Sequence, residues 1–240
     1  MTVCFVTGTD TGVGKTVVTA ALAVILRAGR KKVAVVKPAQ TGARPGEPGD
    51  VDEVRRLAGP VATREGIRLP DPLAPDRAAL VAGAEMPSLL EQRDLILDAA
   101  ASHDAALVEG AGGVTVNLGK AFGLLDIAGQ VRQAGLPVQW IVVARAGLGT
   151  LNHSTLTVRA IRDHGFCVQG IVIGSWPADP GPAELYNRDD LASYVGVPVL
   201  GAVCEGASAL SPSDFQAHAL GWIKIDCRPT ERAVSGGTVA

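Results

Sequence analysis

The sequence predicts an α/β fold in which a doubly wound, mostly parallel sheet carries helices on both faces. Continuous apolar runs, typical of strands covered on both sides, alternate along the chain with stretches whose apolar residues recur at helical spacing. Such alternation indicates a parallel sheet, in which functional sites lie at the carboxyl ends of the strands. The composition agrees, because four Phe, two Tyr and three Trp occur among abundant small and aliphatic residues.

The elements follow in a regular order. Strands are expected at residues 2–7, 33–37, 105–109, 138–144 and 168–173, with a weaker run near 197–203. Helices are expected at residues 15–28, 50–58, 88–101, 123–134, 150–164 and 183–195. Residues 59–87, rich in Pro, Ala and Gly, predict a crossing segment with one short helix at 75–82. We expect one domain over residues 1–228 and a disordered tail over 229–240, which lacks any periodicity.

The first strand and the first helix are joined by a glycine-rich segment, Thr7-Gly8-Thr9-Asp10-Thr11-Gly12-Val13-Gly14-Lys15-Thr16. Glycines let backbone N–H groups point at an anion, and the helix N-terminus adds partial positive charge. Lys15 can then reach the outer phosphates, and the Thr16 hydroxyl can ligate Mg²⁺. The segment departs from G-x-x-x-x-G-K-[ST], because Thr9 stands where the first glycine should be. Its strand-to-helix context favours a nucleotide phosphate site over a chance glycine-rich turn.

Two charged residues end neighbouring strand patterns. Lys37 closes the second strand, where Pro38 is expected to stop the strand, and it faces the same crevice as the phosphate loop. A lysine that merely snorkels at a strand end is the alternative. Glu109 closes the third strand before a run of glycines, a Walker-B arrangement that supplies a Mg²⁺ ligand. The alternative is a strand-end glutamate in a turn.

Other candidates are weaker when judged from the residues alone. Asp50, Asp52 and Glu53 open a helix, where acids commonly serve as caps and dipole partners. The loop from Gly147 feeds another helix start that could hold a carboxylate or phosphate. His153 in that loop is expected to be a helix-start histidine without a catalytic role, and no Ser-His-Asp or Cys-His constellation emerges.

Charge and composition exclude several classes of protein. The formal net charge of −2 gives no basic footprint for nucleic acid, and no apolar run approaches the roughly 20 residues of a membrane span. We therefore expect a soluble, cytoplasmic protein without nucleic-acid or membrane partners. Cysteines at positions 4, 167, 204 and 227 are far apart and are expected to be buried small hydrophobic residues, not disulfides or zinc ligands.

Four motifs together resemble the ATP-dependent dethiobiotin synthetases, a family with a P-loop NTPase-like fold. They are the loop Gly8 to Thr16, Lys37-Pro38 with Gln40-Thr41-Gly42, Glu109-Gly110-Ala111-Gly112-Gly113, and Leu148-Gly149-Thr150-Leu151-Asn152-His153. The resemblance runs from residue 1 to about residue 176 and weakens beyond. The first motif is shared with cobyrinate amidases and partition ATPases, whereas the Lys-Pro pair and the last motif are more specific.

The resemblance implies a reaction and its partners. The substrates are 7,8-diaminononanoate, CO₂ or bicarbonate, and ATP, with Mg²⁺ as the cofactor. CO₂ adds to one amine, ATP phosphorylates the resulting carbamate, and the second amine closes the ureido ring. The family also implies a homodimer with shared active sites, in which one subunit holds the carboxylate tail of the substrate bound to the other.

The resemblance further implies roles for individual residues. The implied catalytic residues are Lys15, Lys37 and Thr11. The implied Mg²⁺ ligands are Thr16, Asp50 and Glu109, with Asp52 as the register alternative to Asp50. The implied nucleotide contacts are Gly12, Val13, Gly14, Lys15, Thr16, Val17, Asp50, Glu109, Gly110, Ala111, Gly112, Gly174, Ser175, Val203, Cys204 and Glu205. The implied substrate contacts are Thr41, Gly112 and Gly113, together with Gly149, Leu151 and Asn152 at the helix start of the second subunit.

Three positions depart from the family pattern. Gly12 stands where relatives often have Glu. Gly174 stands where the family commonly has an Asn that reads adenine, and Cys204 stands where a proline touches the base. The last two changes concern base recognition and leave the phosphate chemistry intact. We therefore expect a loosely held base, bound through backbone and packing on Trp176, so that other triphosphates can replace ATP.

Two other functions compete with the synthetase. A cobyrinate-type amidase would need a glutaminase domain with a nucleophilic Cys and a His, for which the sequence offers no candidate region. A partition-type ATP switch usually carries an extra lysine near the start of the phosphate loop, and Thr9-Asp10-Thr11 has none. Such a switch would hydrolyse ATP slowly without the diamine.

Overall fold

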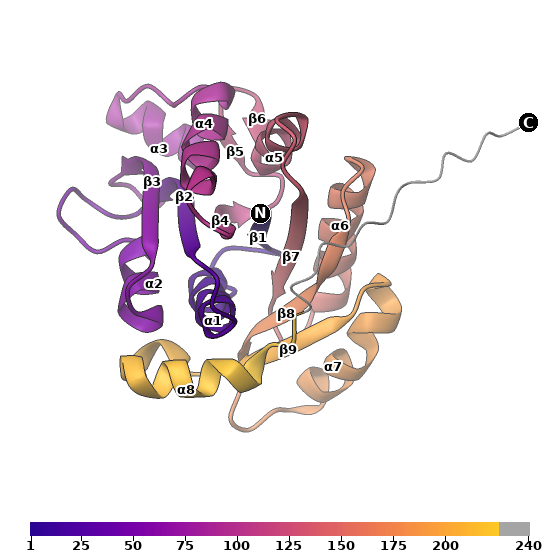
Figure 1. Cartoon of the computed structure of the whole chain (residues 1–240). Helices are drawn as coiled ribbons and strands as arrows, with labels where there is room; N and C mark the ends of the chain where they lie inside the picture. Colours follow the sequence, from indigo (N-terminus) through magenta and orange to yellow (C-terminus); the bar gives the residue numbers. More distant parts are fainter. Residues whose placement is uncertain (226–240) are drawn as a thin grey trace, which may run out of the picture.

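A seven-stranded parallel sheet forms the centre of the computed structural model, which describes residues 1–225 (Figure 1). Every strand pair in this sheet is parallel. In sheet order its strands are β3 (Ala62–Leu69), β2 (Val33–Thr41), β4 (Ala105–Gly113), β1 (Thr2–Gly8), β7 (Val138–Ala144), β8 (Val168–Trp176) and β9 (Val199–Cys204). A separate antiparallel pair, β5 (Asn117–Gly119) and β6 (Phe122–Gly123), follows β4.

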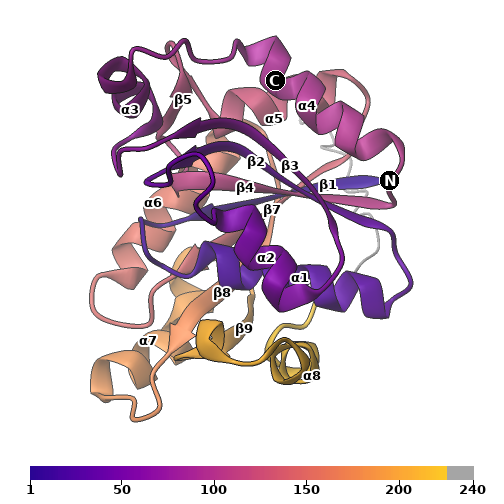
Figure 2. The same ribbon diagram turned by 90° about the vertical axis from the view of Figure 1, so that its left-hand side faces the viewer.

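Helices cover both faces of the sheet, as Figures 1 and 2 show. On one face α1 (Lys15–Ala28), α2 (Asp50–Ala58) and α8 (Pro212–Trp222) pack against one another. The other helices are α3 (Pro75–Ala82), α4 (Leu89–Ala101), α5 (Leu124–Gln133), α6 (Thr150–Asp163) and α7 (Pro182–Val195). Of these, α4 to α7 cover the opposite face, with α4 against α5 and α6 against α7.

The alternation of strand side chains divides the core into two layers. Phe5 of β1 points into the layer under α4 to α7, whereas the adjacent Val6 points into the layer under α1, α2 and α8. Trp140 of β7 is fully buried and stacks on Phe5, with ring centroids 5.0 Å apart. Both layers are nearly all aliphatic, which fixes the sheet and presents its strand ends as a rigid platform.

The predicted fold class and most predicted elements are confirmed. The helices at 15–28, 50–58 and 75–82 have the expected bounds, and so does the strand at 138–144. The crossing segment 59–87 contains a further strand, β3, that the sequence pattern did not reveal. The helix α8 was also missed.

The expectation that Pro38 stops the second strand is wrong, because β2 continues to Thr41. The last residue of β2 that pairs with β4 is Val36, so beyond it β2 has a neighbouring strand on one side only. A proline, which lacks a backbone N–H, is tolerated where a strand has such a free side.

The expectation of buried cysteines is also partly wrong. Cys4 is half-buried, whereas Cys167 and Cys204 are exposed, and all three are free thiols. Cys167 lies just before β8, in the connection that follows α6 and not inside the sheet. Cys227, the end of the expected domain at residue 228 and the expected tail at 229–240 lie outside the described residues. Within residues 1–225 no helix is both long and apolar enough to span a bilayer.

Candidate active site

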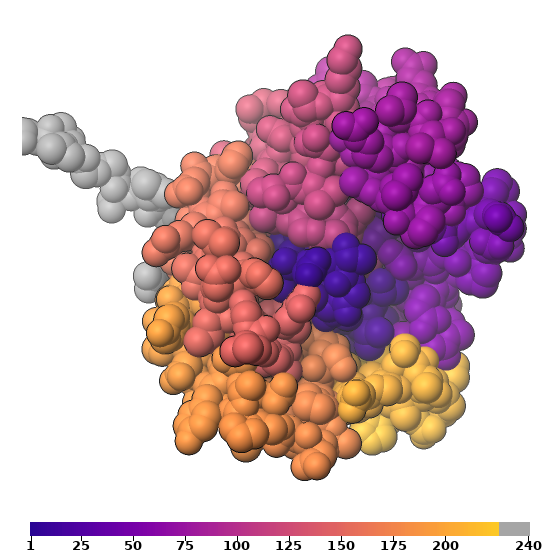
Figure 3. Space-filling model, turned by 180° about the vertical axis from the view of Figure 1, so that it is seen from behind, coloured from indigo at the N-terminus to yellow at the C-terminus, as the bar shows by residue number. Residues whose placement is uncertain are grey.

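The phosphate loop crosses from the carboxyl end of β1 to the start of α1. Gly12 and Gly14 adopt positive φ angles of 72° and 92°, which only glycine accepts readily. Gly14 is also the residue before the first turn of α1, so the free N–H groups of the helix open toward the loop. In the space-filling view this indigo segment reaches the surface in the middle of one face, between salmon and magenta regions (Figure 3). The loop is thus accessible to a ligand.

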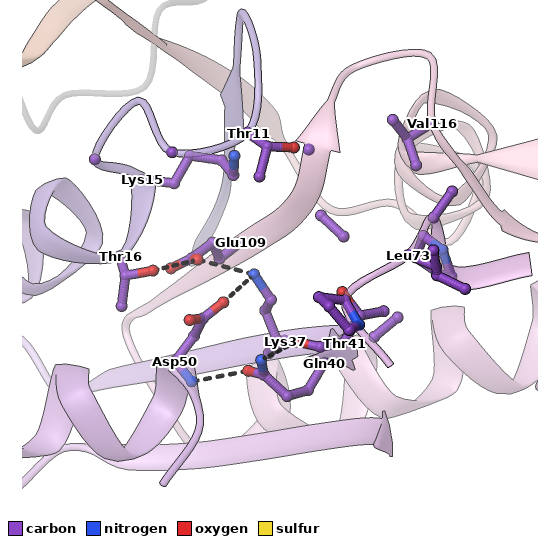
Figure 4. Close-up of a pocket in the computed structure, with 18 of the residues that line it drawn as sticks. Thr11, Lys15, Thr16, Lys37, Gln40, Thr41, Asp50, Leu73, Glu109 and Val116 are labelled. Atoms are coloured by element: carbon purple, nitrogen blue, oxygen red, sulfur yellow. Dashed lines mark hydrogen bonds and ion pairs between the residues drawn. The ribbon is translucent and has the colours of Figure 1, made fainter. Parts of the chain in front are cut away.

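Four polar side chains from four elements meet beside this loop (Figure 4). The Lys37 ammonium of β2 lies 2.9 Å from Glu109 Oε1 of β4 and 2.5 Å from Asp50 Oδ2 of α2. It also donates to the Gly110 carbonyl oxygen at 3.0 Å. The Thr16 hydroxyl donates to Glu109 Oε1 at 2.9 Å. Lys37 and Glu109 are almost wholly buried, at 3% and 1% exposure.

The electrostatics of the cluster follow from burial and close opposite charge. Burial alone would lower the pKa of Lys37, but Glu109 and Asp50 outweigh it and raise that pKa above its ordinary value. Burial would raise the pKa of Asp50, but the Lys37 ammonium holds it below its usual range. Burial, aided by the charge of Lys37, lowers the pKa of Lys15 to about 8. Lys37 and Asp50 are therefore charged near neutral pH, and of the two lysines Lys15 is the closer to losing its proton.

The oxygen atoms around Lys37 suit a small divalent cation. Glu109 Oε2 is buried and has no hydrogen-bond partner among the described residues, so this oxygen can accept a hydrogen bond or bind a cation. Carboxylate and hydroxyl oxygens are the ligands that Mg²⁺ prefers, with phosphate oxygens completing its shell. In the described part of the chain no group of three or more His, Cys, Asp or Glu side chains forms a metal cluster of its own. The site fits a cation shared with a nucleotide better than an all-protein cage.

The two candidate carboxylates of α2 lie in different environments. Asp50 faces Lys37, and its backbone N–H donates to Gln40 Oε1 at 2.8 Å. Asp52 accepts the Gly49 backbone N–H at 2.9 Å and pairs with Arg55, and it does not line the cavity. Asp52 thus acts as the capping residue of the helix, whereas Asp50 belongs to the cluster.

A cavity of about 590 Å³ opens between the phosphate loop and the ends of β2 and β4. It brings together twelve of the residues named from the sequence: Thr11, Gly12, Gly14, Lys15, Thr16, Val17, Lys37, Thr41, Asp50, Glu109, Ala111 and Gly112. The rest of its wall was not predicted to belong to the site, although Gln40 is part of one of the quoted motifs: Ala39, Gln40, Pro72, Leu73, Ala74, Pro75 and Val116. The only sequence signal for the 72–75 segment was its two prolines near a helix start. The added wall is mainly apolar and faces the charged cluster.

Five further predicted residues gather at the ends of β8 and β9, outside this cavity: Gly174, Ser175, Val203, Cys204 and Glu205. Gly174 contacts the phosphate loop so closely that a Cβ on it would lie 2.0 Å from the Val13 carbonyl oxygen. Trp176, by contrast, packs on the core under α6 and α7, with the Arg188 guanidinium 5.1 Å from its ring centroid. Gly174, and not Trp176, connects the ends of β8 and β9 to the phosphate loop.

The remaining predicted substrate residues lie at the start of α6, apart from the cavity. They are Gly149, Leu151 and Asn152. The neighbouring Leu148 is 87% exposed, and Leu156 on the same helix is 56% exposed. Gly113 and Gly110 end β4 without lining the cavity, although Gly110 contributes its carbonyl oxygen to Lys37. Within one chain, the α6 start and the charged cluster remain two separate sites.

Comparisons with known proteins agree on one family. A family model described as "AAA domain" matches residues 2–209. The ATP-dependent dethiobiotin synthetase BioD of Rhodococcus jostii is 49% identical over 223 residues, which cover 92% of this chain and 94% of the relative. The protein of the same name from Streptomyces avermitilis is 49% identical over 223 residues, covering 93% and 92%.

Solved structures show the fold at much lower identity. The septum site-determining protein MinD complexed with Mg-ADP from Pyrococcus horikoshii superposes with a TM-score of 0.58 at 16% identity, covering 92% of this chain and 90% of that one. A ParA family ATPase from Chlorobium tepidum gives a TM-score of 0.58 at 14% identity, covering 91% and 97%. These likenesses establish a P-loop NTPase architecture.

Proposed function

Because the chain belongs to the ATP-dependent dethiobiotin synthetases, within the AAA domain family, we propose how its own residues divide the work of that reaction. The enzyme is an ATP-dependent cyclo-ligase of biotin biosynthesis. It closes the ureido ring of dethiobiotin from 7,8-diaminononanoate and CO₂, giving ADP and phosphate. The observation that supports the assignment of roles is the buried Lys37–Glu109–Asp50 cluster beside the phosphate loop.

The reaction brings anions together and therefore needs a cationic site. A carbamate, formed from one amine and CO₂, attacks the γ-phosphorus of ATP and releases ADP. The second amine then attacks the carbonyl carbon of the carbamic-phosphoric anhydride and expels phosphate. Lys15 and Lys37 supply positive charge where negative charge develops, and Thr11 donates a hydrogen bond to the phosphoryl group. Both lysines line the same cavity, which supports this division.

Thr16, Asp50 and Glu109 would hold Mg²⁺, and Asp50 is the better choice over Asp52 because only Asp50 reaches the cluster. When bound, Mg²⁺ would supply charge to the triphosphate. The Lys37 ammonium lies between the two carboxylates, so it and a divalent ion would compete for the same oxygen atoms. Beside such an ion the Lys37 ammonium would face the carbamate and act as the catalytic cation.

The apolar wall fits the hydrocarbon part of the diamine. Leu73 and Val116 line the cavity opposite the charged cluster, and Thr41 lies at the end of β2 between them and Lys37. Methylene groups of the substrate would pack on this wall, while its amines lie near Gly112 and Thr41. Gly113 is the last residue of β4, next to Gly112.

The carboxylate tail of the diamine is then held by a second subunit. Gly149, Leu151 and Asn152 begin α6, whose free N–H groups attract a carboxylate. Leu148 and Leu156 are exposed apolar residues on and beside this helix, as expected for a surface that a partner covers. We assign the enzyme to the cytoplasm, where ATP is available.

The nucleotide base would lie against the β8 and β9 ends, where Gly174 offers no side-chain amide. Turnover with CTP or GTP should approach that with ATP at equal, subsaturating concentrations. Turnover far below that of ATP would show that the base is read by other groups.

The first test of the function is ADP release from the purified enzyme with MgATP and bicarbonate, with and without 7,8-diaminononanoate. Release that depends on the diamine, with dethiobiotin formed one for one, is expected. Release indifferent to the diamine would favour the ATP-switch alternative.

The shared site can be tested by mixing two inactive variants. Lys37→Met removes the catalytic cation, and Asn152→Asp repels the substrate carboxylate at the α6 start of the other subunit. Each alone should be nearly inactive. After subunit exchange the mixture should regain roughly a quarter of wild-type activity, because half of the dimers contain one intact site of two. A mixture as inactive as its components would argue against shared sites.

A further inference from the structure

An ion pair outside the catalytic cavity connects the phosphate loop to the segment after β7. Arg145 follows the last residue of β7, and its Nη2 donates to Asp10 Oδ2 in the first half of the loop. A backbone hydrogen bond already joins the two chain segments just before this pair, because the Thr9 N–H donates to the Val143 carbonyl oxygen at 2.9 Å. The pair therefore extends the contact between β1 and β7 beyond the end of the sheet. Neither residue lines the cavity.

Asp10 holds the two loop residues that act on phosphate. Its Oδ1 accepts the Thr11 backbone N–H at 2.7 Å, and its carbonyl oxygen accepts the Lys15 ammonium at 3.0 Å. A shift of Asp10 would thus displace both Thr11 and Lys15.

Arg145 is attached to a firm part of the fold. The next carbonyl oxygen, that of Ala146, accepts a hydrogen bond of 2.9 Å from Asn187, a buried side chain of α7. Ala146 itself is buried in the core under α6 and α7. The arginine therefore reaches the loop from a fixed backbone position.

We propose that Asp10 and Arg145 form a positioning pair that presets the first half of the phosphate loop for nucleotide. The pair touches neither phosphate nor diamine, and it acts by holding Thr11 and Lys15. Both side chains are about half exposed, so the ion pair itself adds little to global stability. Its effect lies in nucleotide affinity, because a loop that is already ordered loses less conformational freedom on binding. The inference rests on the proposed function only in that ATP occupies this loop.

A double-mutant cycle on ADP binding tests the pair. Asp10→Asn keeps an oxygen acceptor for the Thr11 N–H but removes the charge, and Arg145→Gln removes the charge of the partner. Each single variant should raise the Kd for ADP, measured by calorimetry, roughly fivefold. The double variant should be no weaker than either single one, because the same interaction is lost in all three. Arg145→Lys should recover part of the affinity.

Matched readouts separate positioning from a structural role. Tm should stay within about 2 °C of wild type in each variant, and the KM for the diamine should not change. Arg159→Gln removes an exposed arginine farther along α6 and should leave the Kd for ADP unchanged. Additive losses in the double variant, or unchanged ADP affinity in Arg145→Gln, would overturn the proposal. Because ADP binding needs no diamine, the cycle stays informative even if the enzyme does not form dethiobiotin.

Discussion

Replacing Lys37 by Met should separate its ion pairing with two carboxylates from the catalytic role that we propose for it. The substitution keeps a long apolar stem but removes the ammonium that lies 2.9 Å from Glu109 and 2.5 Å from Asp50. Breaking a buried ion pair costs about 3–5 kcal/mol, since a buried charge is left without a partner. The Asp50 side chain is 34% exposed, so water reduces its share of that cost, and we take the lower end, about 3 kcal/mol.

That loss corresponds to a fall in Tm of roughly 6–12 °C for a domain of this size. Turnover should fall by roughly two to three orders of magnitude, because the variant lacks a cation at the developing charge. In the absence of nucleotide, Mg²⁺ should raise the Tm of the variant more than that of the wild type. In the wild type it must displace the ammonium, whereas in the variant it meets two free carboxylates. At about 100 times its Kd, Mg²⁺ contributes about 2.7 kcal/mol and would restore most of the lost stability.

Thermal unfolding with and without MgCl₂, alongside ADP release, measures all three effects. Lys120→Met, which removes an exposed lysine from the turn between β5 and β6, serves as the control and should match the wild type throughout. The reasoning would be refuted by a Lys37→Met enzyme that turns over normally. An equal rise in Tm with Mg²⁺ in wild type and variant would refute the idea that the ammonium and the metal share one place.

Three further predictions address single positions. Asp50→Asn removes a proposed metal ligand, so it should lower turnover roughly tenfold or more and raise the Mg²⁺ concentration that gives the half-maximal rate. Asp52→Asn should leave turnover within about twofold of wild type. Titrating the rate with Mg²⁺ measures both effects. Gly174→Ala should weaken ADP binding about tenfold and lower Tm, because its Cβ would lie 2.0 Å from a loop carbonyl oxygen; Gly129→Ala, where an added Cβ meets nothing within 4 Å, should change neither. ADP affinity should fall as pH rises through about 8, because the Lys15 ammonium attracts phosphate only below that pKa, while it is protonated. Lys15→Arg should abolish this pH dependence. An ADP affinity that does not change between pH 7 and 9 would contradict the assignment.

The central strands could be predicted because both of their faces are covered. Continuous apolar runs such as 138–144 leave little ambiguity. The missed strand β3 lies at the sheet edge, and half of the residues in its sequence, Ala62-Thr-Arg-Glu-Gly-Ile-Arg-Leu69, are polar or charged. Edge strands commonly carry such charges, so the pattern resembles a loop. Pro38 misled the prediction for a related reason, since proline is excluded only where a strand is paired on both sides.

The polar part of the site was predictable, but its apolar wall was not. Lys37 and Glu109 each end an apolar run, and a charged residue at the end of such a run is a local signal, although both strands continue four residues farther. Leu73 and Val116 lie in connections without regular structure, and nothing in their neighbours' spacing indicates that they face the cluster. Their placement depends on how the chain crosses between strands, which is a tertiary property.

Strand order decides which strand ends lie next to each other, and it also places different groups of residues on the two sides of the phosphate loop. β1 lies between β4 and β7, so its loop has a neighbour on each side. On one side Thr16 bonds Glu109, 93 residues away, and on the other Asp10 pairs with Arg145, 135 residues away. Lys37, Asp50 and Glu109 all lie toward β4 and β2, whereas Gly174 belongs to β8. Changes on the first side should therefore act mainly on kcat and metal dependence, and changes on the second mainly on nucleotide affinity and base preference, because the rigid sheet between them keeps the two sets of contacts apart.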